Sequence, residues 1–243
     1  MAMALAGLLA AAWSLDGYRH PVAAATHPVS WAQVAKWPDF TGGVWVSPGA
    51  DGSPHAEDLP LNAAARAFIQ RYGNRYGSGA ASCAPRGMPW NLGNQFIYSR
   101  GLILILGAPD YYQVVRRVYM DGRGHGDPDP TYFGNSIGHW DGDTLVIDTT
   151  GFLPEELLTE GLPNYGKTHI IERYRLLAPG QLQLQLTVGN PALLTHDWTQ
   201  TRVYHLQRGE QVPESYCTNN RDQGGEANLT PPPTLPPLPG VQP

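Results

Sequence analysis

The chain has 243 residues, and its 28 Gly and 23 Pro, with only 15 % charged residues, are typical of a protein with many turns rather than long helices. The formal net charge is −5 and the 16 Lys and Arg are scattered singly, so the sequence lacks the basic stripe that nucleic-acid binding requires. The length fits one large β domain, which we predict for residues 26–220.

The N-terminal segment 1–25 predicts export. It opens on an apolar run, and Ala23, Ala24 and Ala25 resemble the cleavage site of a signal peptide. The run is too short to cross a bilayer, which takes about 20 residues, and no later stretch is long enough either. No Lys or Arg precedes the run, so a mis-assigned start or a lipid-facing anchor stays open as an alternative. We expect a periplasmic or secreted protein.

Cys83 and Cys217 are the only two cysteines, and an even count in an exported chain predicts one disulfide between them. The bridge would tie the C-terminal segment to the front of the domain, and closing so long a loop contributes roughly 4–5 kcal/mol in the chain-entropy model. Two buried free thiols are the alternative.

The first half of the chain predicts two helices and four strands. Residues 26–36 form a partial helix, and residues 39–46 form a first strand in which Trp45 can plug one end of a barrel. Residues 57–72 form the longer helix, because their apolar side chains recur at helical spacing. Three further strands follow closely, at 95–99, 102–106 and 111–120.

The second half predicts two hairpins and a last strand. The first hairpin turns at Asp141-Gly142, because Asp-Gly between β-favouring runs is the strongest short hairpin signal; its arms are 135–140 and 143–150. The later strands are 168–177, 181–188 and 198–206. Gln alternates with Leu after Gln181, which indicates one wet face and one dry face.

These strands, up to nine of them, predict a mainly β protein. Their short turns suggest an antiparallel meander that closes on itself, with one or two short helices. The Gly43-x-Trp45 pattern resembles the opening strand of lipocalin-like barrels, so we expect a barrel of that calycin type. A Pro-rich tail at 221–243 should be extended and peripheral.

Asp148 is the most informative polar residue of the first hairpin. Leu145 and Ile147 point to one face of its second arm, whereas Val146 and Asp148 point to the other. If that second face lines an interior, the carboxylate must be hydrogen-bonded or paired, because an unpartnered buried charge costs several kcal/mol. The alternative is a solvated hairpin in which Asp148 caps the turn that follows.

The loop before this hairpin gathers groups suited to acid–base chemistry. It contains Tyr119, Arg123 and His125 with three carboxylates, on a backbone bent by Gly and Pro. His125 is the natural proton carrier, because histidine exchanges protons near working pH. A polar surface loop is the alternative.

Two segments also suggest metal ligands. His125-x-Asp127-x-Asp129 and His139-x-Asp141-x-Asp143 each place one imidazole and two carboxylates at alternating positions. Both lie partly in turns and match neither an EF-hand nor a zinc motif, so turn formation explains them better. We therefore predict neither a metal nor a cofactor.

The strand at 168–177 adds a second set of polar groups. His169 and Arg173 share one of its faces, whereas Glu172 and Tyr174 share the other. We expect His169 or Glu172 to meet Asp148 or Tyr119 from a neighbouring strand. An ion pair between Arg173 and Asp148 is the structural alternative.

Three motifs taken together resemble a family. Met120-Asp121-Gly122-Arg123-x-His125, the hairpin 138–152 and His169-x-x-Glu172-Arg173 resemble segments of a large, mainly uncharacterised group of exported bacterial proteins. The likeness covers most of the chain from about Cys83 to Cys217, and the W-x-G-D-T-L-V-x-D-T-x-G-F hairpin is specific. Gly126 stands where members usually have Pro. The resemblance implies export and a lipocalin-like barrel, but no reaction. It marks as matching positions Tyr119, Arg123, His125, Asp148, His169 and Glu172.

Our leading hypothesis is a cofactor-independent acid–base enzyme, a lyase, isomerase or cyclase, that holds a small apolar or aromatic molecule in the barrel mouth. His125 or His169 would act as the base, oriented by Asp148 or Glu172, with Tyr119 as a hydrogen-bond donor to a developing oxyanion. The residues predicted to hold the substrate are Arg123, Arg173, Tyr174, Trp140 and Trp198.

Two other functions stay open. A carrier of hydrophobic ligands would need only one or two polar anchors in the same cavity. A carbohydrate-active barrel would need the carboxyl groups of Asp148 and Glu172 about 5–9.5 Å apart across a groove. The oligomeric state also stays open.

Overall fold

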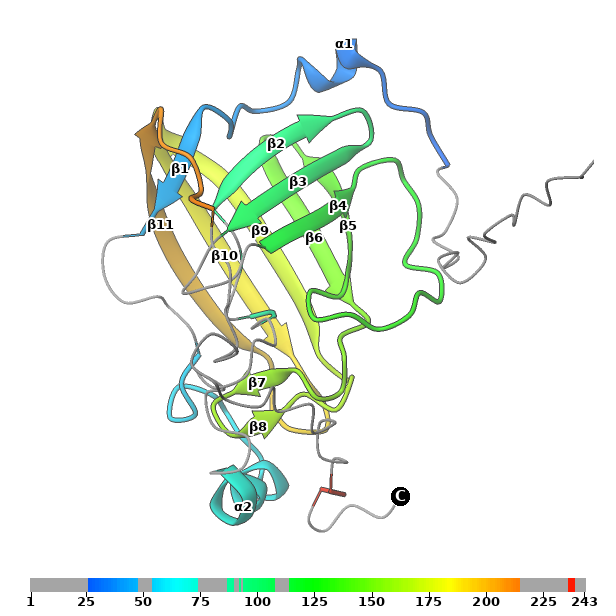
Figure 1. Cartoon of the computed structure of the whole chain (residues 1–243), viewed down its shortest axis with the longest axis vertical. Helices are drawn as coiled ribbons and strands as arrows, with labels where there is room; N and C mark the ends of the chain where they lie inside the picture. The colour runs from blue at the N-terminus through cyan, green and yellow to red at the C-terminus, as the bar shows by residue number, and fades with distance from the viewer. Residues whose placement is uncertain are drawn as a thin grey trace, which may run out of the picture.

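A computed structural model describes residues 26–47, 54–73, 87–89, 92, 94–107, 114–214 and 236–238. Over these residues the chain forms a nearly closed, nine-stranded β-barrel with two helices, which confirms the predicted fold class (Figure 1). The strands lie in the order β1-β11-β10-β9-β6-β5-β4-β3-β2. Their bounds are β1 Gly43–Val46, β2 Gln95–Ser99, β3 Leu102–Gly107, β4 Val114–Tyr119, β5 Asn135–Asp141, β6 Thr144–Thr150, β9 His169–Ala178, β10 Gln181–Gly189 and β11 Trp198–Arg208.

Both predicted hairpins are confirmed, as β5–β6 and β9–β10. One pairing departs from the expected antiparallel meander. β4 and β5 run parallel, joined at Val118↔Ser136 and Tyr119↔Ile137. Parallel neighbours need a long connection, and residues 120–134 provide it by returning along the outside of the barrel.

β1 and β2 approach each other at the edge where the sheet nearly closes. The backbone N–H of Trp45 donates to the carbonyl of Asn94, directly before β2, at 2.8 Å. The backbone N–H of Val212, beyond β11, donates to Oε1 of Gln95 at 3.2 Å. At this edge a few hydrogen bonds stand in place of continuous backbone pairing between β1 and β2.

The barrel interior is filled by side chains. Leu182, Leu184, Leu186 and Val188 of β10 are fully buried, and the glutamines between them face outward, as the alternation predicted. On β6 the fully buried residues are Leu145, Ile147 and Thr149. Because alternate residues of a strand face opposite sides, Asp148 lies on the outer wall.

An aromatic cluster closes one end of the barrel. The indole Nε1–H of Trp45 donates to the carbonyl of Phe40 at 2.7 Å, and Trp45 is 2 % exposed. The ring of Phe40 contacts those of Phe96 and Trp140, with centroids 5.5 Å apart in both pairs. Trp45 therefore plugs this end, as predicted.

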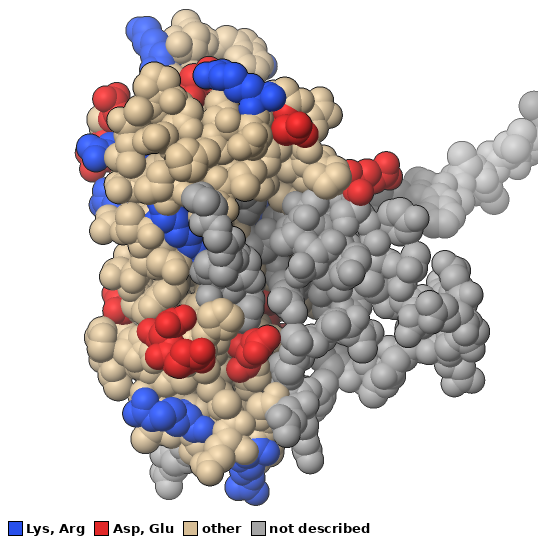
Figure 2. Space-filling model, turned by 90° about the vertical axis from the view of Figure 1, so that its left-hand side faces the viewer, with Lys and Arg blue, Asp and Glu red and all other residues tan. Residues whose placement is uncertain are grey.

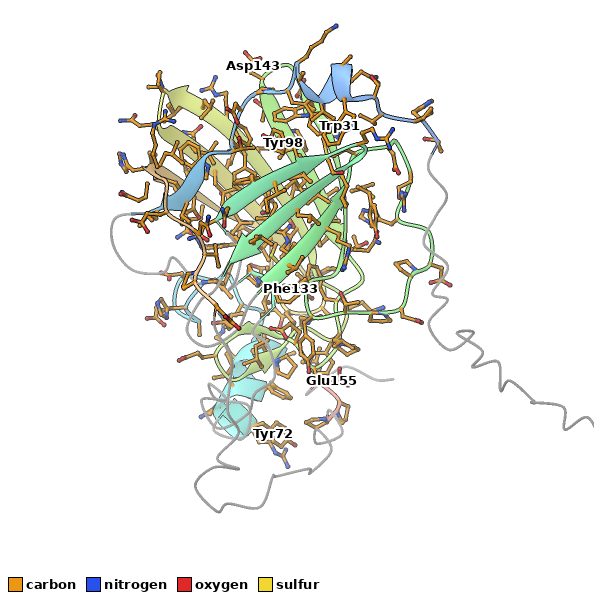
Figure 3. The ribbon with its side chains drawn as sticks, turned by 45° about the horizontal axis from the view of Figure 1, so that its top comes forward. Trp31, Tyr72, Tyr98, Phe133, Asp143 and Glu155 are labelled. Carbon is orange, nitrogen blue, oxygen red and sulfur yellow. The ribbon has the colours of Figure 1, made fainter. Side chains whose placement is uncertain are left out.

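The helices lie at opposite ends of the barrel (Figure 1). α1, Trp31–Val34, lies at the end closed by the aromatic cluster. α2, Ala63–Tyr72, lies at the other end beside a small two-stranded sheet of β7, Leu157–Thr159, and β8, Leu162–Pro163. Figure 3 shows Trp31 and Asp143 near the first end and Tyr72 and Glu155 near the second.

α2 begins later than the predicted residue 57. Leu61 forms a β-bridge with Leu194, and Asn62 then caps the helix by accepting a hydrogen bond from the N–H of Ala65 at 2.9 Å. The apolar residues before Asn62 therefore do not extend the helix, and Leu61 pairs with Leu194 instead.

Two predictions fall on residues outside those described. They are the signal peptide at 1–25 and the disulfide between Cys83 and Cys217. Of the Pro-rich tail, residues 236–238 are described, and they pack against the domain. The hydroxyl of Tyr165 donates to the carbonyl of Pro236, and Leu238 is buried in the core.

The described surface has mixed charge. On the face shown in Figure 2, Lys and Arg side chains are interspersed with Asp and Glu, without a continuous stripe of either sign. Among the described residues, no helix has the length and apolar character needed to cross a membrane.

Candidate active site

Two histidines meet one carboxylate on the outer wall of the barrel. Nε2–H of His125 donates to Oδ1 of Asp148 at 3.0 Å, and Nε2–H of His169 donates to the same oxygen at 2.9 Å. We call these three residues the His–Asp–His cluster. Sequence reasoning brought His125, Asp148 and His169 together correctly but expected them at the barrel mouth, whereas they face outward.

The strand register explains two members of the cluster. Asp148 pairs with Ile171 and Thr149 with Ile170, so His169 at the start of β9 is the diagonal neighbour of Asp148 on the outer face. The third member, His125, comes from the 120–134 connection, which passes over this wall. The parallel β4–β5 pairing is therefore what brings the second imidazole to Asp148.

Asn135 supports His125 from the start of β5. Its Oδ1 lies 3.0 Å from Nδ1 of His125, so both ring nitrogens of this histidine face oxygen atoms. Both are satisfied when the imidazolium form donates twice, or when the amide of Asn135 is turned so that its NH₂ group donates. His125 is thus held on both sides, and its side chain is only 24 % exposed.

His169 is held on one side only. Its Nε2 is used by Asp148, and Nδ1 has no hydrogen-bond partner among the residues that the structure describes. Its side chain is 51 % exposed. A carboxylate that accepts from one ring nitrogen fixes the neutral tautomer and leaves the lone pair of the other nitrogen available as a base.

Apolar side chains flank the carboxylate. Tyr119, Ile137, Asp148 and Ile171 form one row across four strands of the outer wall, and all four are partly exposed. Tyr119 lies two strands from Asp148, which the spacing of strands sets at roughly 10 Å. Tyr119 therefore does not contact the cluster, although both lie on the outer face of the barrel wall.

Arg123 holds the loop that carries His125. Its Nε and Nη2 donate to the two carboxylate oxygens of Asp121 at 2.8 and 2.6 Å, and its guanidinium lies 4.0 Å from the ring centre of Tyr119. The backbone carbonyl of Asp121 accepts from the N–H groups of Thr26 and His27. Arg123, predicted to bind substrate, is thus used in an internal ion pair.

The Arg123–Asp121 pair should make stability depend on pH. The hydrogen bond from Arg123 lowers the pKa of Asp121, so the pair contributes its full stability above the ordinary carboxyl pKa of about 3.9 and loses it as the pH falls through the lowered value. We expect Arg123→Gln to be less stable than wild type to urea at pH 7, with a difference that narrows below about pH 4. Arg117→Gln, on the exposed face of β4, is the control. A difference that stays constant with pH would contradict this role.

Glu172 does not join the cluster, which corrects its predicted place. It points into the barrel, where Oε2 accepts from Nη2 of Arg116 at 2.6 Å and Oε1 accepts from the hydroxyl of Tyr174 at 2.7 Å. Because Glu172 pairs with Ile147 in register, it lies on the opposite side of the wall from Asp148. The two carboxylates therefore cannot flank one glycosidic bond, as the carbohydrate-active alternative required of this pair.

The predicted substrate-binding aromatics and Arg173 also do not join the cluster. Tyr174 is 2 % exposed inside the barrel, where burial, followed by the charge of Glu172, raises its pKa well above the ordinary value. Trp140 and Trp198 are partly buried against the core. Nη1 of Arg173 lies 3.6 Å from Asp141, so the predicted alternative of an Arg173–Asp148 pair is wrong.

Sequence reasoning missed Asn135 and Arg116. Asn135 could have been found, because the Asp141-Gly142 turn pairs it with Thr150 and so puts it on the face of Asp148. Arg116 gave no such signal, because its partner Glu172 is 56 positions away.

No group of three or more His, Cys, Asp or Glu side chains within the described ranges is arranged to hold a metal ion. The fold and the site together define a lipocalin-like barrel with a His–Asp–His cluster on its outer wall. No protein-family model matches the chain, and no curated protein matches its sequence.

Proposed function

We propose that the chain is a cofactor-independent acid–base enzyme in which His169 moves the proton. The observation that carries the proposal is the sharing of one oxygen: Oδ1 of Asp148 accepts from both His125 and His169. His125 has its other nitrogen occupied by Asn135, so it orients the carboxylate. His169 has its other nitrogen available, so it is the group that can touch a substrate.

The reaction class follows from what these groups can stabilise. When Nδ1 of His169 accepts a proton, the imidazolium that forms lies against the Asp148 carboxylate, which stabilises the new positive charge. Ile137 and Ile171 offer apolar contacts on either side, which suits a small apolar or aromatic molecule. We propose a lyase or isomerase step that begins with removal of a proton from an activated carbon.

The proposed place of action is outside the cytoplasm. The apolar N-terminal segment and its small-residue site are typical of an exported protein, and the resemblance to exported bacterial proteins agrees with this.

The direct test is His169→Gln with an activated carbon acid. Ring opening of 5-nitrobenzisoxazole needs only a base: the base takes the ring C–H proton, the N–O bond breaks, and a coloured nitrophenolate is released. We expect wild type to exceed free imidazole at the same concentration by about 10²–10⁴-fold, the usual contribution of a positioned base. His169→Gln should lose this advantage, while His205→Gln, an exposed histidine on β11, should keep it.

Either of two results would reject the proposal. One is a wild-type rate no higher than that of free imidazole. The other is a His169→Gln rate equal to wild type, which would show that the cluster has only a structural role, holding the 120–134 connection against the barrel wall. Unfolding by urea, measured on each variant, shows whether a lost rate reflects a lost fold.

A further inference from the structure

A second candidate site lies at the rim of the barrel, at the end that bears α1. It is an open hollow of about 390 Å³, formed by the β9–β10 turn, the end of β11 and the segment before β1; we call it the rim pocket. β9 runs from His169 to Ala178, so the cluster and the rim pocket lie at opposite ends of this strand, roughly 30 Å apart. No residue belongs to both.

The walls of the rim pocket are mainly apolar. Leu176 and Leu206, which line it together with Trp45, are partly buried against the core, and Leu177 keeps 43 % of its surface exposed at the turn. Pockets of about 300–1,000 Å³ with such walls are the usual size for small organic ligands. The space and the exposed leucine together suit an apolar body.

The rim pocket is lined by one side chain of each charge, Asp39 and Arg208. Asp39 is engaged within its own turn, because Oδ1 accepts from the N–H and the hydroxyl of Thr41 at 2.9 and 2.6 Å. Arg208 lines the same hollow, is exposed, and makes no side-chain hydrogen bond or ion pair with any residue of the described part of the chain. A guanidinium fork fits a carboxylate or similar anion with two parallel hydrogen bonds.

We infer that the rim pocket binds a small amphiphile with an apolar body and one anionic head. The body lies against Leu176, Leu206 and Trp45, and the head meets Arg208. This site is independent of the acid–base chemistry proposed for the outer wall, and it provides the ligand-binding role that a barrel carrier needs.

Two fluorescent probes that differ only in the head group test the assignment. They are 1-anilinonaphthalene-8-sulfonate, which is anionic, and N-phenyl-1-naphthylamine, which has the same rings without the sulfonate. Arg208→Gln should weaken binding of the sulfonate by about fivefold or more, as the loss of a charge-assisted hydrogen bond predicts. Binding of the neutral probe should change less than twofold. Arg175→Gln, which changes an exposed arginine on β9 outside the rim pocket, should change neither.

A blocking variant separates this pocket from other apolar surface. Ala178 is exposed and lines the hollow, so Ala178→Trp can fill it without disturbing the core. We expect this variant to lose both probes, and decanoate to displace the sulfonate probe from wild type more effectively than decanol does. Retention of both probes by Ala178→Trp, or equal effects of Arg208→Gln on the two probes, would overturn the assignment.

Discussion

Glu172→Gln is expected to lower the free energy of unfolding by about 3–5 kcal/mol, the usual effect of leaving one charge of a buried pair without its partner. Arg116 is 1 % exposed and Glu172 is completely buried. Burial opposes the charge of Arg116, but the carboxylate of Glu172 raises the pKa of the guanidinium above its ordinary value. The substitution keeps the shape of the side chain, so urea unfolding should report the loss of the charge.

A double-mutant cycle tests this explanation. Arg116→Met alone leaves the carboxylate buried without its cation, so it too should be strongly destabilising, whereas the double variant should lose much less than the sum of the two single losses. Arg173→Gln removes an exposed pair with Asp141 and should change stability by less than about 1 kcal/mol. Additive losses in the cycle would show that the two buried side chains act separately.

Asp148→Asn should lower the rate of the proton-transfer assay by about 10²–10⁴-fold. The amide has no charge to stabilise the imidazolium that forms on His169, and its NH₂ group can force the proton of that ring onto Nδ1. Nδ1 would then no longer be a base. Because Asp148 lies on the outer wall with a side chain 36 % exposed, the variant should fold normally, and kcat should fall more than KM changes.

Asp143→Asn is the matched control for this result. Asp143 is in the turn of the same hairpin, exposed, at the end of the barrel that bears α1 (Figure 3), and it precedes Asp148 by five positions. It should keep the wild-type rate. An Asp148→Asn variant with full activity would remove the carboxylate from the proposed mechanism, even if His169→Gln were inactive.

The elements that could be predicted are those with a local signal. The Asp141-Gly142 turn set the register of β5–β6, and the Gln and Leu alternation of β10 set which of its faces is dry. β7 and β8 have three and two residues, too few to show a period, so the sequence did not predict them. The parallel β4–β5 pairing depends on the path of the 120–134 connection, which no local pattern specifies.

The candidate site was predicted only in part, because some of its contacts have no local signal in the sequence. The residue types around Asp148 were recognisable, but Val146 made both faces of β6 apolar, so the sequence did not decide which one faces the core. Glu172 was assigned to the site because it matches the family motif and was expected to meet Asp148 or Tyr119 from a neighbouring strand. Its real partner, Arg116, becomes a neighbour only when the barrel closes.

Strands β2, β3 and β4 form a unit, here called the panel, that is joined to the rest of the barrel by few hydrogen bonds at both of its edges, β4–β5 and β2–β1. Inside the panel the strands are fully laddered, but β4 meets β5 at two register pairs, and the other edge is held near β1 by the hydrogen bond between Trp45 and Asn94. Detaching this panel breaks fewer backbone hydrogen bonds than parting β9 from β10. The Arg116–Glu172 pair links β4 of the panel to β9 through the barrel interior, so it adds a side-chain contact between the panel and the rest of the barrel.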